Sequence, residues 1–118
     1  MSPRLATIAI GIGLSAPVLC TAAPDEHAAA GFYARICAVC HGPGGDGKGP
    51  AGVALNPKPA NFTDATRMAK RSDAELVQVI LDGGQAAGLS PLMPPFRDSV
   101  SEADAAAIVA LLRSFAAR

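Results

Sequence analysis

The stretch that decides the fold of this chain is Cys37-Ala38-Val39-Cys40-His41, which is followed by the helix-ending pair Gly42-Pro43. On a helix, side chains three and four positions apart lie on the same side. The two sulfur atoms and the imidazole of His41 are therefore expected to converge on one surface. A Cys-x-x-Cys-His pattern is typical of covalent haem attachment, with thioether bonds from the cysteines and the histidine on the iron.

Three other kinds of site use cysteines at this spacing. A zinc site needs two more ligands, and the soft donors left besides His41 are His27 and methionines. A thioredoxin-like redox pair normally follows a strand, and no strand pattern precedes Cys37. A plain disulfide explains neither the export signal nor the long loops described below. The pattern therefore favours haem at Cys37 and Cys40, with His41 as an iron ligand.

A methionine is expected as the second axial ligand, because haem that cycles between two oxidation states often pairs histidine with a thioether. Met93 lies between Pro91 and Pro94-Pro95, and a residue before proline is disfavoured in helical geometry. Its side chain is thus expected on a stiff, extended loop. The competitor is Met68, which has Arg67, Lys70 and Arg71 as neighbours. We expect Met93 to be the ligand and Met68 to fill space in the core.

The first residues predict an exported protein. A short head with one positive charge precedes an apolar run at residues 5–19, which is too short for a membrane helix. We expect residues 1–22 to be a cleaved signal peptide, with a domain at 23–118 in the periplasm. Cleavage after Ala23 and a lipid anchor at Cys20 are the alternatives. Cleavage after Ala22 removes one arginine and leaves a net charge of −1, which indicates no nucleic-acid partner.

The rest of the chain predicts an all-α fold of three or more helices joined by long loops. A helix is expected over 26–41, another from the capping box of Ser72 and Glu75 to Gly83-Gly84, and a last one from Ser101. Residues 42–59 contain six glycines and four prolines, which excludes long regular structure. The run 42–49 resembles a phosphate-binding loop but has glycine in place of the final Ser or Thr. Its glycines are expected to let the backbone approach a flat ligand.

With these motifs, residues 26–116 resemble a bacterial class I cytochrome c. The resemblance rests on the Cys-x-x-Cys-His-Gly motif, Gly49-Pro50, the segment 56–62, Pro91-Leu92-Met93-Pro94-Pro95-Phe96 and the last helix. It implies one haem c wrapped by crossing first and last helices. Tyr33 then pairs with Leu111 and Leu112, Ala29 stands at the family's usual crossing glycine, and the carbonyl of Pro50 accepts the N–H of His41.

The resemblance implies a one-electron carrier rather than an enzyme, because two filled axial positions leave no place for a substrate. Its partners are expected to be a transient redox donor and acceptor, with membrane contact only through membrane-bound partners. A permanent haem subunit of a larger periplasmic oxidoreductase is the alternative. A ligand-sensing haem protein is another if Met93 does not bind the iron. Electron exchange is expected at a haem edge framed by uncharged residues, namely Ala38, Val39, Gly42, Pro43, Pro95 and Phe96. The alternative is a basic spot of Arg67, Lys70 and Arg71 that guides an acidic partner.

Overall fold

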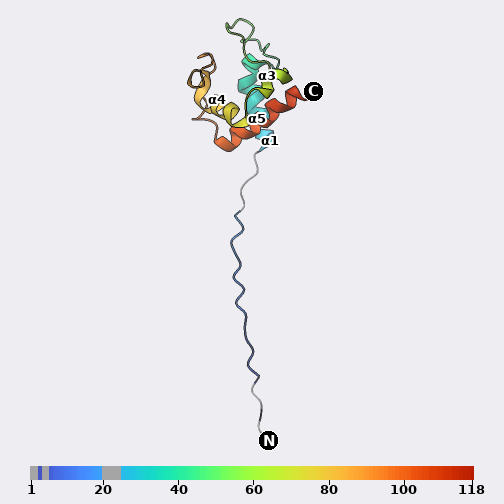
Figure 1. Ribbon diagram of the computed structural model, residues 1–118, viewed down its shortest axis with the longest axis vertical. Coiled ribbons are helices and arrows are strands. Elements are labelled where there is room, and N and C mark those ends of the chain that lie inside the picture. Colours follow the sequence, from blue (N-terminus) through green and yellow to red (C-terminus); the bar gives the residue numbers. More distant parts are fainter. Residues whose placement is uncertain (1–2, 4–5, 20–24) are drawn as a thin grey trace.

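The computed structural model describes residues 3, 6–19 and 25–118, and every regular element in these ranges is a helix (Figure 1). The elements are α1 (Glu26–Phe32), the π-helical segment η1 (Tyr33–Cys37), α2 (Ala38–His41), α3 (Ala65–Ala69), α4 (Asp73–Ala86) and α5 (Glu102–Ala116). The predicted all-α class is confirmed. Long loops join α2 to α3 and α4 to α5.

The helical segment predicted over 26–41 is present, with a π turn in its middle that was not predicted. The side chain of Asp25 caps α1 by accepting the backbone N–H groups of residues 27 and 28. In η1 the N–H of Ala38 bonds to the carbonyl of Tyr33, five residues earlier. Ala29, Tyr33 and Ala38 are the buried residues of the whole segment. Gly42, at φ +82°, ends it.

Capping boxes begin the two long helices, as predicted. Ser72 and Glu75 exchange hydrogen bonds at the start of α4, and Ser101 and Asp104 do so at the start of α5. The regular part of α4 stops at Gly83, whose φ of +83° and ψ of 169° are not helical, so the predicted stop is confirmed. The short helix α3 was not predicted.

The core forms where α1 and α4 pack against α5 (Figure 1). Its members are mostly small or medium apolar side chains, namely Ala29, Tyr33, Ala38, Phe62, Met68, Leu76, Ile80, Leu81, Val100, Ala105, Ala107, Ile108, Val109, Leu112 and Phe115. Leu112 is buried and Leu111 partly buried, but the ring that contacts Tyr33 is that of Phe115, with centroids 5.2 Å apart. Few large residues fill this core.

The glycine-rich loop packs on the polypeptide itself. A Cβ atom on Gly49 would lie 2.4 Å from the carbonyl oxygens of both Ala38 and Val39. Gly49 also donates its N–H to Cys40, and Ala51 donates to Val39. The expectation of a close backbone approach is right, but the surface at Gly49 is the end of α2 and not a flat ligand.

Residues 6–19 are extended and exposed (Figure 1). No helix within the described ranges is both long enough and apolar enough to cross a membrane. The predicted cleavage between Ala22 and Ala23, and the alternative lipid site at Cys20, lie outside the described residues. The signal peptide at 1–22 therefore stays a prediction.

Candidate cofactor site

Both cysteines lie within one helical turn, because Cys37 ends η1 and Cys40 lies in α2. Both thiols are free and partly exposed. Burial raises the pKa of the Cys37 thiol to about 11. It therefore stays protonated at neutral pH, unlike the low-pKa nucleophile of a redox pair. No group of three His, Cys, Asp or Glu side chains in the described ranges could hold a metal ion, which counts against the zinc alternative.

His41 is oriented by a backbone carbonyl. Its Nδ1 lies 3.1 Å from the oxygen of Ala60, and because a carbonyl only accepts, Nδ1 carries the proton and donates it. This leaves the lone pair of Nε2 free for a metal. Burial lowers the pKa of His41, and the charge of Arg67 lowers it further, so the ring is neutral at pH 7. The ring of Phe62 stacks on the imidazole at 4.5 Å.

The acceptor expected from the resemblance was the carbonyl of Pro50, and the structure places Ala60 there instead. Pro50 is exposed in a turn whose flanking residues, Gly49 and Ala51, are hydrogen-bonded to the carbonyls of α2. The loop therefore bonds to the backbone of α2 at this point and reaches the imidazole only ten residues later. The nearby Phe62, the one aromatic residue between α2 and α3, was the available sequence signal for this second approach.

Met93 lies on the loop between α4 and α5 and is partly buried. Its carbonyl accepts the N–H of Gly84 at 2.9 Å, and its own N–H donates to Ser90 at 3.3 Å. A Cβ atom on Gly84 would lie 2.1 Å from the Ser90 carbonyl oxygen and 3.1 Å from the Cβ of Met93. The glycine pair that ends α4 thus lets the methionine loop lie against the end of the helix.

Met68 occupies a different environment. It is 5% exposed in α3 and belongs to the core cluster. Its carbonyl accepts a hydrogen bond from Arg113, which also bonds to the carbonyl of Arg71 and the carboxylate of Asp73. The neighbouring Arg67 is exposed. This burial agrees with the interpretation of Met68 as core packing.

The surroundings suit a flat apolar group. Ile36 and Val39, which flank the cysteines, are 42% and 44% exposed, and Leu92, next to Met93, is 50% exposed. A covalently attached haem requires two thiols, an imidazole, a second ligand such as a thioether, and apolar side chains around them, and the chain supplies each of these groups. The residues present therefore fit the group.

Comparison with known proteins decides the family. Residues 24–112 match the model of the family described as cytochrome c oxidase, cbb3-type, subunit III. The chain belongs to that family. A solved structure, the KustC0563 c-type cytochrome, is also similar, with a TM-score of 0.59 and 26% identity over 74% of this chain and 95% of that one. No curated protein sequence matches significantly.

The chain is thus a class I c-type cytochrome that carries covalently bound haem c, and its function is haem-based electron transfer. Proteins of this family are generally electron carriers rather than enzymes, and c-type cytochromes are typically exported.

Proposed function

We propose that this cytochrome is a periplasmic one-electron carrier whose haem is bound through thioethers at Cys37 and Cys40, with His41 and Met93 on the iron. The observation that carries the proposal is the orientation of His41. Its Nδ1 is engaged by the carbonyl of Ala60 while two free thiols lie within the same helical turn. A ring held in this tautomer presents Nε2 as the only free lone pair.

The chain's own residues supply binding and electronic control. The haem, when bound, supplies an iron that changes oxidation state by one electron. The carbonyl of Ala60 fixes the imidazole and raises its basicity as a ligand. Gly84 holds the backbone of Met93. If His41 and Met93 both hold the iron, no place would remain on it for a substrate, and the group would supply electron transfer alone.

Haem staining on a denaturing gel tests the attachment. The wild-type chain, made in a host that matures c-type haem, is expected to give a peroxidase-active band, because thioether bonds survive denaturation. Cys37→Ser and Cys40→Ser should reduce the band sharply, and His41→Ala should prevent a stable product. Cys20→Ser is the matched control, since residue 20 falls in the expected signal peptide. Equal staining of all variants would contradict the assignment.

Carbon monoxide tests the second axial ligand. If Met93 binds the iron, the ferrous wild type should bind carbon monoxide poorly and the Met93→Ala variant should bind it readily. Ready binding by the wild type would indicate an open position and therefore a ligand-sensing protein.

A second candidate function is that of a haem subunit in a larger periplasmic oxidoreductase. The observation that favours it is the matched family model, which describes subunit III of an oxidase. Native mass measurement of a gently prepared periplasmic fraction separates the two. A carrier runs at the mass of a single chain, whereas a permanent subunit runs with its partners.

A further inference from the structure

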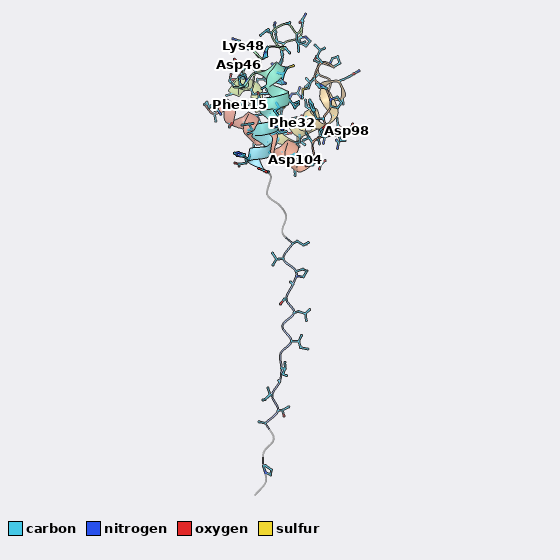
Figure 2. The ribbon with its side chains drawn as sticks, turned by 180° about the vertical axis from the view of Figure 1, so that it is seen from behind. Phe32, Asp46, Lys48, Asp98, Asp104 and Phe115 are labelled. Carbon is cyan, nitrogen blue, oxygen red and sulfur yellow. The ribbon has the colours of Figure 1, made fainter. Side chains whose placement is uncertain are left out.

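The charges of this cytochrome are divided along the chain. Residues 46–71 contain five basic and two acidic side chains, and residues 73–104 contain six acidic side chains and one basic. In Figure 2, Lys48 lies near the end of the domain remote from Asp104. The cations of 46–71 form no salt bridge with any carboxylate in the described part of the chain, where the ion pairs are Arg97–Asp82 and Arg113–Asp73. The charge of those cations that have no acidic neighbour is therefore available to a partner.

Three of these cations line one hollow in the surface. Lys48, Lys58 and Arg67 surround a space of about 470 Å³ together with Asn61 and Val53. Val53 is 53% exposed and provides an apolar spot within the basic rim. The hollow also contains the carboxylate of Asp46, which accepts the backbone N–H of Lys48. We call this set the basic hollow.

The structure divides the basic spot expected from the sequence. Arg67 belongs to the basic hollow, whereas Arg71 lines a second hollow of about 330 Å³ beside Glu75. The acidic neighbour offsets the charge of Arg71. The grouping in space is therefore Arg67 with Lys48 and Lys58, which come from the preceding loop.

The basic hollow adjoins the proposed iron ligand through three consecutive residues. The carbonyl of Ala60 holds His41, Asn61 lines the hollow, and Phe62 stacks on the imidazole. A partner seated on the hollow is therefore separated from the histidine by this short segment. Charge complementarity requires such a partner to present carboxylates.

We propose that the basic hollow is the surface on which this cytochrome docks an acidic redox protein. The inference rests on the proposed electron-carrier function and adds the chemistry of the partner. Unpaired cations steer an anionic surface during encounter, and the exposed Val53 provides a small apolar contact that releases readily.

The test compares two double variants that remove the same charge. Lys48→Gln with Arg67→Gln alters the basic hollow, and Lys70→Gln with Arg71→Gln is the matched control. Stopped-flow mixing measures oxidation of the ferrous holoprotein by hexacyanoferrate(III), a trianion that accepts one electron and becomes hexacyanoferrate(II). At low ionic strength the hollow variant should react about tenfold more slowly than wild type and the control no more than about threefold. The difference should vanish at high salt.

A second measurement tests docking itself. Poly-L-glutamate, the acidic probe, is titrated into the isotope-labelled oxidised holoprotein, and amide chemical shifts are followed by NMR. Shifts should be confined to residues 46–62 and 67 and should be lost in the hollow variant but kept in the control.

Each outcome has a defined meaning. Shifts centred on Ile36, Val39 and Leu92, or equal rate losses in the two double variants, would overturn the docking surface and favour the apolar edge beside the cysteines. A wild-type chain without haem would instead refute the proposed function. Because the wild type is first checked for haem, the two failures are distinguishable.

Discussion

Gly84→Ala is the substitution whose effect on Met93 follows most directly from the structure. The added Cβ would lie 2.1 Å from the carbonyl oxygen of Ser90, and real Cβ atoms are essentially never found within 3.0 Å of such an atom. The oxygen must therefore retreat by at least 0.9 Å. That movement pulls on a loop held by two bonds at the same glycine, Gly84 to Met93 at 2.9 Å and Leu89 to Gly84 at 2.7 Å.

The size of the effect can be estimated from its parts. Overpacking a well-packed site costs about 1–3 kcal/mol, and weakening one backbone hydrogen bond costs about 1 kcal/mol. Replacing glycine by alanine in a helix recovers at most about 1 kcal/mol. We expect the loop conformation that holds Met93 to lose about 2 kcal/mol of stability relative to other conformations of the loop. This loss raises the population of the form with Met93 off the iron by more than tenfold.

The assay is the near-infrared sulfur-to-iron band of the oxidised holoprotein, followed with temperature alongside the reduction potential. The Gly84→Ala variant should lose the band at a lower temperature than wild type and have a lower potential, while haem stays attached. Gly44→Ala is the control, because a Cβ there meets nothing within 4 Å. An unchanged band and potential in Gly84→Ala would refute the claim that this glycine seats the methionine loop.

Three further predictions concern other parts of the chain. Met93→Ala should abolish the near-infrared band. Met68→Ala should keep the band and lower the unfolding free energy by about 2–5 kcal/mol, as for other buried side chains. The reverse pattern would mean that Met68 is the ligand. Tyr33→Phe removes a buried 2.7 Å hydrogen bond to the carbonyl of Gly42 and should cost about 1–3 kcal/mol in chemical denaturation. Burial raises the pKa of Tyr33 above its ordinary value of 10.0, so its contribution to stability should be complete below pH 10 and decline at higher pH, and an equally steep alkaline decline in the Phe variant would contradict this. The exported chain should begin at Ala23, and an intact mass with one haem that fits another start, or a lipid, would disprove it.

Local signals explain why much of the fold could be predicted from the sequence. Each of these signals depends on residues within a few positions of each other, as in the capping boxes at Ser72 and Ser101 and the helix stop at Gly83. Each can therefore be predicted without knowledge of the tertiary structure. The helix α3 was missed because it has five residues and no apolar period, although Asp64 caps it. The cysteine motif predicted the cofactor because covalent attachment of haem requires this spacing of the two cysteines and the histidine.

The parts of the site that could not be predicted depend on how loops fold back. The acceptor for His41 lies nineteen positions later in the chain and is set by the path of the loop between them, and nothing local distinguishes the carbonyl of Pro50 from that of Ala60. Likewise, the clash that fixes Gly84 comes from a residue six positions later in a turn of irregular form. Arg67 and Arg71 are only four positions apart, but α3 ends at Ala69, so Arg71 lies beyond the helix and lines a different hollow.

The π turn at Tyr33–Cys37 makes the first helical segment tolerant of a change in length. The buried residue that follows Tyr33 on the core face is Ala38, five positions later. In a regular α-helix it would be the residue four positions later, which is Cys37. The additional residue leaves Cys37 partly buried at the margin of the core. Deleting a single residue between Tyr33 and Cys37, such as Ala34, would restore α pitch and still bring Ala38 beneath Tyr33. Relatives with this segment one residue shorter can therefore keep both the core face and the cysteine face, whereas a deletion within α1 would rotate one face against the other by about 100°.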